Sequence, residues 1–318
     1  MGKPDNNQQI LRARVRSQSV FKTALRIVAY PELRGPTLRC IRLIFYHFFF
    51  QQYKAALFPK RIPVSQVDHP LDMRIPFSPS WVGIYMDFSY FWIRILGFML
   101  SQYGEQALGP VKEFIESMGA VYAYAGEVYA ANLSTTHRPR YLAKAQFVLI
   151  HVADPHLMCV PSLHVMVMIN AYTRFTAMVN QLGGGERFAE QIREIRQGAI
   201  EITEAILYVK QHSVNCIAAA MYAMTRFAEP LFPLAEAENF ASLLYQLPAS
   251  QSLPPRRGRR LFNKAVSLQA EIPEISTEDR EPIRQYIYER YRQFMLEGSA
   301  ALDWKKPLLD FLAETRRL

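Results

Sequence analysis

The sequence is poor in cysteine and lacks the common signatures of nucleotide chemistry. Its 318 residues include three cysteines, Cys40, Cys159 and Cys216, which lie far apart. This spacing excludes a disulfide framework and a C-x-x-C metal pair. Neither G-x-x-x-x-G-K nor G-x-G-x-x-G occurs, so two common nucleotide-binding loops are absent.

Nucleic-acid motifs are also missing, although the chain is basic. The net charge of +9 is concentrated in residues 1–27 and 254–264. Such clusters suit nucleic acid, the anionic face of a membrane, or a solvated tail. Because no interleaved aromatic residues or recognition motif accompany them, we expect no nucleic-acid partner.

We expect no cleavable signal peptide, and every long apolar segment is interrupted. The first 17 residues are mostly polar, and no short apolar stretch leads to a small-residue cleavage site. Residues 81–100 would span roughly 30 Å as a helix, but they include Asp87 and Arg94. These two residues are seven positions apart, so we expect them to share a helix face.

Half of the residues are apolar, and they gather in segments of helical length. The predicted helices cover residues 43–53, 81–100, 107–133, 165–182, 197–211 and 213–232. One interpretation is a soluble all-α bundle, which the mean hydropathy of -0.05 favours. The other is six membrane helices with inward-facing charges. It gains support because the polar loop predicted at 183–198 and both basic termini would then fall on one side.

The composition changes near residue 250. Residues 252–260 have the prolines and charges of a linker. Ser276 or Thr277, ahead of Glu278 and Asp279, predicts a helix N-terminus, and residues 302–318 resemble a last amphipathic helix. We therefore divide the chain into a basic N-terminal segment (1–35), a helical domain (36–235) and a soluble helical C-terminal tail (250–318).

Three polar groups interrupt the apolar pattern, at residues 134–141, 160–165 and 208–216. An antiparallel helix pair between them would return His212 to the neighbourhood of His164. Arg138 ends the preceding helix and would lie at the same end. We therefore expect two imidazoles, a guanidinium and the Lys210 ammonium to converge at one mouth of the bundle.

This set of side chains suits phosphoryl transfer. Arg138 and Lys210 would bind phosphate oxygens. Ser162 would add a hydroxyl donor at a helix start, where backbone N–H groups and the helix dipole favour an anion. Two histidines can divide the chemistry, one attacking phosphorus and the other protonating the leaving oxygen.

These residues resemble the motifs of the type-2 phosphatidic acid phosphatase superfamily, which includes lipid phosphate phosphatases and related phosphotransferases. The family pattern is K-x6-R-P, P-S-G-H and S-R-x5-H-x3-D. Here it corresponds to Arg138–Pro139, to Pro161–His164 and to the KQH that ends at His212. Residues 69–81 also resemble the segment ahead of the second helix in one branch. The similarity covers residues 65–230.

The resemblance implies both a fold and a mechanism. The fold would be all-α, a six-helix membrane bundle with both termini cytoplasmic, followed by the soluble helical tail. His212 would be the nucleophile that forms a phosphohistidine, and His164 the general acid. Arg138 and Ser162 would bind phosphate.

Several family residues are replaced in this chain. The lysine of the first motif falls on Ala131, the glycine of the second on Leu163, and the S-R pair of the third on Ala205 and Ile206. Leu163 matches a variant that occurs in one branch of the family. Lys210 would replace the lost arginine in part.

The aspartate that closes the third motif falls on Cys216. That aspartate holds the nucleophilic imidazole in one tautomer and balances its charge, which a neutral thiol cannot do. Asn215, at i+3 from His212, would orient the ring without neutralising it. In serine proteases the comparable Asp→Asn change costs about 10⁴ in rate, so we expect a slow enzyme or none.

A metal site is a further alternative that the spacing disfavours. His151, Asp154, His156, Cys159 and His164 fall within a short stretch, but H-x4-H-x2-C-x4-H matches no standard zinc pattern. We expect no metal and no other cofactor.

The sequence thus predicts a multi-pass protein of the cytoplasmic (inner) membrane. It would hydrolyse or transfer the phosphate of a lipid phosphate or an isoprenyl (pyro)phosphate, with membrane lipids as its other partners. One alternative is a catalytically inactive family member that binds lipid phosphate or acts as a membrane scaffold. Another is a soluble helical bundle in which the motif match is accidental.

Overall fold

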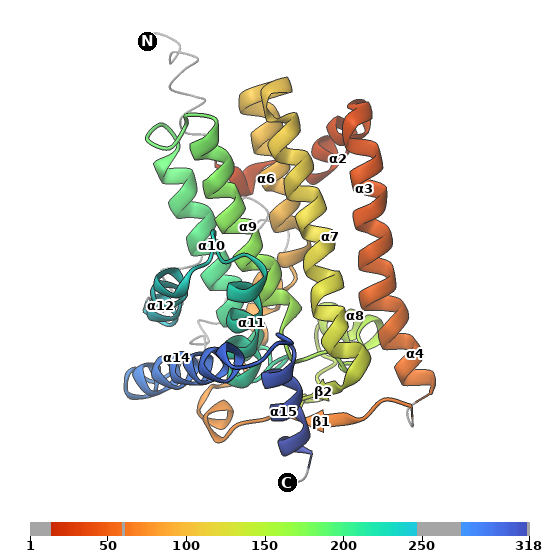
Figure 1. Cartoon of the computed structure of the whole chain (residues 1–318), viewed down its shortest axis with the longest axis vertical. Coiled ribbons are helices and arrows are strands. Elements are labelled where there is room, and N and C mark those ends of the chain that lie inside the picture. Colours follow the sequence, from red (N-terminus) through yellow and green to blue (C-terminus); the bar gives the residue numbers. More distant parts are fainter. Residues whose placement is uncertain (1–13, 59–60, 247–274, 317–318) are drawn as a thin grey trace.

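The computed structural model describes residues 14–58, 61–246 and 275–316. Long helices run side by side along the molecule, and a short two-stranded sheet and two C-terminal helices gather at one end (Figure 1). The predicted all-α class is confirmed, since the described residues are mostly helical. The predicted linker at 252–260, the basic cluster at 254–264 and residues 1–13 lie outside the described residues.

Five helices form the centre of the bundle, three more run along its side, and short helices and strands complete the fold. The central helices are α6 (Phe88–Tyr103), α7 (Leu108–Ala131), α9 (Leu163–Gln181), α10 (Ala189–Tyr208) and α11 (Val214–Phe227). The side helices are α2 (Val20–Ala29), α3 (Pro31–Ile44) and α4 (Gln51–Leu57). The remaining α-helices are α5 (Val82–Tyr85), α8 (Ala145–Ala153), α12 (Leu234–Leu243), α14 (Thr277–Ser299) and α15 (Lys306–Thr315). Short 3-10 turns are η1 (Val15–Ser17), η3 (Pro70–Arg74), η4 (Pro79–Trp81) and η5 (Gly104–Ala107).

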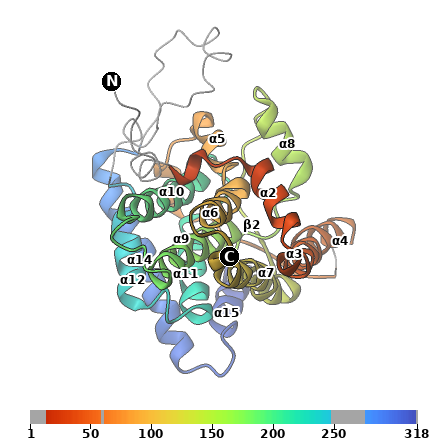
Figure 2. The ribbon, with the colours of Figure 1, turned by 90° about the horizontal axis from the view of Figure 1, so that it is seen from above.

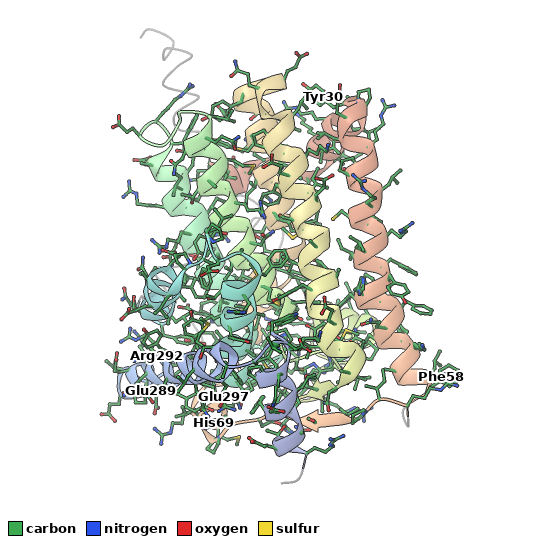
Figure 3. The ribbon with its side chains drawn as sticks, in the orientation of Figure 1. Tyr30, Phe58, His69, Glu289, Arg292 and Glu297 are labelled. Atoms are coloured by element: carbon green, nitrogen blue, oxygen red, sulfur yellow. The ribbon has the colours of Figure 1, made fainter. Side chains whose placement is uncertain are left out.

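Two of the side helices, α3 and α4, form one long element. A π-helical turn, η2 (Phe45–Phe50), joins α3 to α4 without a break. In Figure 3, Tyr30 and Phe58 mark the two ends of this element, which runs along the whole bundle. The helix predicted at 43–53 is therefore the second half of a longer one.

Helix α9 lies at the centre of the bundle. Helices α6, α7, α10 and α11 all contact it, and the view from above shows them around it (Figure 2). Its polar residue Asn170 is fully buried and donates to the Ser117 hydroxyl of α7 at 3.0 Å. That hydrogen bond offsets the cost of a buried amide.

The prediction of a polar loop over 183–198 is wrong from Ala189 onward, because α10 begins there. Ile195 and Ala199 are fully buried, and Ile192 packs against the same core. The spacing of these three residues gives the segment an apolar helix face that its many charges conceal.

Two strands at the lower end of Figure 1 brace the polar loops, and the sequence predicted neither of them. Strand β1 (Val64–Gln66) pairs in parallel with β2 (Leu133–Thr135). Helix α15 covers β1, where the Ser65 hydroxyl donates to the Leu312 carbonyl.

Helix α14 packs against α11. Its start confirms the predicted cap, since the Ser276 hydroxyl accepts from the Asp279 N–H at 3.1 Å.

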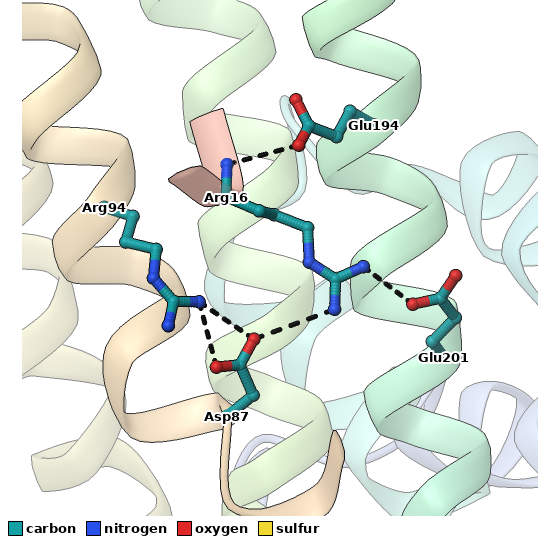
Figure 4. A network of polar contacts seen from close by, with 5 residues as sticks. All are labelled: Arg16, Asp87, Arg94, Glu194 and Glu201. Atoms are coloured by element: carbon teal, nitrogen blue, oxygen red, sulfur yellow. Dashed lines mark hydrogen bonds and ion pairs between the residues drawn. The ribbon is translucent and has the colours of Figure 1, made fainter. Parts of the chain in front are cut away.

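A buried network of charges joins the N-terminal turn to the bundle (Figure 4). Arg94 Nη1 donates to both carboxylate oxygens of Asp87 at 2.9 Å, which confirms that these residues share a face. Arg16 lies between Asp87 and Glu201, at 3.7 and 2.8 Å. The Glu194 carboxylate accepts from the Arg16 N–H.

Across the described ranges, no helix is both long enough and apolar enough to cross a membrane.

Candidate functional site

The helical hairpin of α9 and α10 brings together the two imidazoles that the sequence singled out. His164 lies in the first turn of α9, and His212 lies in the loop between α10 and α11. His212 Nε2 is 3.4 Å from His164 Nδ1, although the residues are 48 positions apart. Both side chains are buried, each only 8% exposed.

Ser162 joins the pair at the same nitrogen. Its Oγ is 3.4 Å from His212 Nε2. Ser162 is the N-cap of α9, but its hydroxyl does not cap the helix. Its backbone N–H donates to the Cys216 carbonyl at 3.3 Å, which ties the start of α9 to α11. A hydroxyl and a second imidazole thus meet at Nε2 of His212.

Aromatic rings form the wall on the other side of His164. Tyr85 stacks on the imidazole at 4.6 Å between ring centroids, and Phe88 lies at 4.1 Å. Among the described residues, His164 Nε2 has no hydrogen-bond partner. The wall therefore keeps this ring away from bulk water without binding its outer nitrogen.

Burial keeps the His212 ring uncharged near neutral pH. It lowers the pKa of His212 to about 4, while the nearby Cys159 carbonyl acts in the opposite direction. The imidazole then retains a free lone pair at pH 7, as a nucleophile requires.

Arg138 lies at the same mouth, but its guanidinium faces protein acceptors. It donates to the Asp154 carbonyl from Nη1 and Nη2 at 3.3 and 3.2 Å. It also donates to Gln211 Oε1 at 3.2 Å. Because Gln211 precedes His212 in the chain, the guanidinium is tied to the loop that carries the imidazole.

Lys210 does not join the cluster, contrary to the sequence prediction. Its ammonium donates to the carbonyls of Asp72 and Ile75. The backbone at Lys210 is left-handed, with φ of 55°. The two carbonyls satisfy this partly buried ammonium, so it holds a neighbouring segment in place.

Asn215 also lies elsewhere, and the prediction that it orients His212 has no support in its contacts. Its amide nitrogen donates to the Val67 carbonyl at 3.1 Å. Its oxygen accepts from the Tyr286 hydroxyl at 2.7 Å. The amide is therefore occupied between a loop and α14.

Cys216 has a local role at the start of α11. Its thiol accepts from the Ser213 N–H at 3.4 Å, as part of a capping box. The structure records no hydrogen bond from this thiol to His212 within the described ranges. A sulfur at this position does not replace the family's carboxylate.

Comparisons with protein-family models, with curated proteins and with solved structures gave no match to this chain. Its function is therefore argued from the site itself.

His156 is a further buried residue of this region, for which the sequence pattern indicates no role beyond the disfavoured metal site. Its Nε2 is 2.9 Å from Thr136 Oγ1, and its backbone N–H donates to Asp154 Oδ1 at 2.8 Å. Its φ is 62°, a conformation that costs energy in most residues but is more common in histidine. Burial, with Arg138 and His212 nearby, lowers the pKa of His156 to about 3.

The possible metal cluster around His156 did not appear. In the part of the chain that the structure describes, no three His, Cys, Asp or Glu side chains are arranged to hold a metal ion.

Proposed function

We propose that the chain is a membrane lipid-phosphate phosphatase or phosphotransferase of the type-2 phosphatidic acid phosphatase kind. The single observation that carries the proposal is the meeting of Ser162 and His164 at Nε2 of His212, each at 3.4 Å. These are the motif residues that the resemblance singled out. A chance match of short motifs would not require them to meet at one atom.

The geometry supports a two-step reaction. His212 Nε2 attacks phosphorus, the bond from phosphorus to the lipid oxygen breaks, and His164 gives that oxygen a proton. Burial lowers the pKa of His164 well below its ordinary value, so this ring takes up its proton together with the substrate, whose phosphate dianion favours the imidazolium form that acts as the acid. In the second step His164 takes a proton from water or from an acceptor alcohol, whose oxygen displaces His212 from phosphorus. Both imidazoles return to their starting state.

A phosphoryl group must separate the two rings in order to react. Their contact at 3.4 Å leaves no room for phosphorus and a leaving oxygen between the nitrogens. Arg138 is tied to Gln211, the residue before His212, so its guanidinium is held beside the loop that carries the imidazole. This linkage supports its proposed role in binding phosphate.

The surface of the side helices supports the membrane part of the proposal. Large apolar side chains project outward along α2, α3 and η2, among them Phe21, Leu38 and Phe45, which are 72%, 68% and 62% exposed. On α8, Val152 is 71% exposed. A group of exposed large apolar side chains on these helices suits contact with lipid.

Phosphate release tests the catalytic part. We expect the purified protein to release phosphate from phosphatidic acid or from an isoprenyl pyrophosphate, and His212→Ala and His164→Ala to lose that activity. His137→Ala is the matched control, since that residue is exposed and we assign it no role. Equal rates in the wild type and His212→Ala would exclude the proposed nucleophile.

Alkaline carbonate extraction tests the membrane part separately. We expect the protein to stay in the membrane pellet. Its release into the supernatant would remove the membrane assignment while leaving the phosphatase test to be judged on its own result.

A second candidate, a family member that binds lipid phosphate without turnover, has an observation in its favour. In the described residues no carboxylate hydrogen-bonds to His212, and Lys210 and Asn215 face other partners. This candidate predicts binding to vesicles that contain phosphatidic acid, weakened by Arg138→Gln, with no phosphate release. Phosphate release by the wild type that His212→Ala abolishes would exclude it.

A further inference from the structure

We propose that Asp72 is a positioning residue for His212, and that residues 69–75 act as a clamp on the loop that carries this imidazole. The inference rests on the proposed function, because it concerns the same nucleophile. It assigns a role to a segment that the motifs leave without one.

The clamp holds the loop on both sides of His212. Asp72 Oδ1 accepts from the Val214 N–H at 2.9 Å, two residues after the histidine. The Asp72 carbonyl accepts from the ammonium of Lys210, two residues before it. The Ile75 carbonyl also accepts from Lys210. One residue thus binds the loop on either side of the proposed nucleophile.

The Asp72 side chain is also held by a hydrogen bond within its own segment. Its Oδ2 accepts from the His69 N–H at 2.7 Å, at the start of η3. Burial raises the pKa of Asp72, and hydrogen bonds from Ser213, Val214 and His69 act in the opposite direction. The carboxylate lies at the first turn of α11, where a helix favours negative charge.

A clamp matters here because His212 has no ionic partner in the described part of the chain. The groups hydrogen-bonded to its Nε2 are the Ser162 hydroxyl and the His164 ring. With Cys216 in place of the family's aspartate, the ring position depends more on the backbone of residues 210–214. A misplacement of about 1 Å can cost an enzyme about 10²-fold in rate.

Helix α14 holds the clamp from outside. The His69 ring stacks on Tyr286 at 4.0 Å, and Arg74 pairs with Asp279 at 3.2 Å. Figure 3 shows His69 at the end of the molecule where α14 lies. The Tyr286 hydroxyl also donates to Asn215. Helix α14 therefore contacts both the clamp and the start of α11.

Two substitutions of Asp72 test the inference in the full-length protein. We expect Asp72→Ala to lower kcat about 100-fold with little change in KM. Asp72→Asn keeps an oxygen that can accept from Val214, so it should retain more of the rate than Asp72→Ala. Asp310→Ala, which removes an exposed carboxylate on α15, is the control and should keep full activity.

Chemical modification gives a readout that does not need turnover. Diethyl pyrocarbonate reacts with accessible imidazoles, and peptide mass spectrometry follows each histidine. We expect Asp72→Ala to raise the modification rate of His212 several-fold while that of exposed His137 stays constant. A general loss of folding would also raise the modification rate of His156, which is only 6% exposed, whereas exposed His137 measures the activity of the reagent. Tyr286→Phe should give a smaller change in the same direction.

The outcomes separate the two proposals. If the wild type releases no phosphate, the proposed function fails, while the modification rates still test the clamp. The clamp is excluded if His212 reacts equally fast in the wild type, Asp72→Asn and Asp72→Ala. It is also excluded if these variants change KM alone.

Discussion

At the scale of single residues, the candidate site is buried, and burial lowers the pKa of the His212 ring so that it is neutral at pH 7. His212 is hydrogen-bonded through Nε2 to a hydroxyl and an imidazole. The resemblance would instead place a carboxylate four residues later, where Cys216 stands. The lost charge is the clearest physical difference between this site and the family pattern.

Restoring that charge should therefore raise activity. Cys216→Asp can keep the contact to the Ser213 N–H and adds a negative charge four residues after His212. A nearby negative charge stabilises the imidazolium-like charge that develops during attack. We expect kcat to increase about tenfold or more. Cys216→Asn is the matched control, and equal rates in the two variants would show that charge is not the missing element.

The buried histidines also predict how stability depends on pH. Burial lowers the pKa of His212 to about 4 and that of His156 to about 3, against 6.5 in the unfolded chain. As pH falls through 6.5, the unfolded state binds protons first. The contribution of these two histidines to the free energy of unfolding therefore falls progressively between pH 6.5 and their lower pKa values in the folded state.

A pair of proteins isolates this contribution. We expect the free energy of unfolding of the wild type to fall more between pH 6.5 and 4.5 than that of His156→Gln/His212→Gln, measured by denaturant titration. Burial raises the pKa of Asp72 and Asp154, which acts in the opposite sense. Both proteins retain these carboxylates, so their effect cancels in the comparison. An equal fall of the free energy of unfolding in the two proteins between pH 6.5 and 4.5 would contradict the lowered pKa values of these histidines.

At the scale of elements, two glycines allow α3 and η2 to approach α7 closely. A Cβ on Gly119 would press against the Cys40 backbone, and one on Gly126 would collide with the His47 ring. The two glycines are seven positions apart, so they lie on one face of the helix. The long side element depends on this smooth face for its contact with the bundle.

Gly126→Ala should therefore destabilise the fold despite the better helix propensity of alanine. The steric cost is about 1 to 3 kcal/mol, and the propensity gain of up to about 1 kcal/mol offsets part of it. Gly109→Ala is the matched control on the same helix, because a Cβ there meets nothing within 4 Å. Thermal unfolding should show a lower Tm for the first variant and an equal or higher Tm for the second. A Tm that rises equally in both would contradict the close approach.

The sequence predicted the elements that have a long apolar period and the meeting of the two imidazoles, which follows from counting along a hairpin. It did not predict β1 and β2, since three residues each are too few to show strand alternation. It also misplaced Lys210 and Asn215. Their directions depend on a left-handed residue and on contacts with segments about 70 to 150 positions away, which local spacing does not encode.

At the scale of the whole molecule, the charge network of Figure 4 fastens the N-terminal turn between α6 and α10. Arg16 pairs with Glu201, which is almost fully buried. Removing one partner of a buried ion pair leaves the other charge without compensation.

Arg16→Met should therefore cost about 3 kcal/mol in the free energy of unfolding. Arg39→Met is the control, because its pair with Glu116 at 2.8 Å is exposed and such pairs contribute about 0 to 1 kcal/mol. Equal losses in the two variants, measured by denaturant titration, would show that the Figure 4 network does not stabilise the fold.

The hydrogen bond between Ser65 and Leu312 joins residues 247 positions apart. This separation determines how early during biosynthesis β1 can form its contact with α15. At ribosomal rates of about 5 to 20 residues per second, β1 waits roughly 10 to 50 seconds after translation for its last partner. The nascent chain therefore completes the end of the molecule that holds its imidazoles only when α15 emerges.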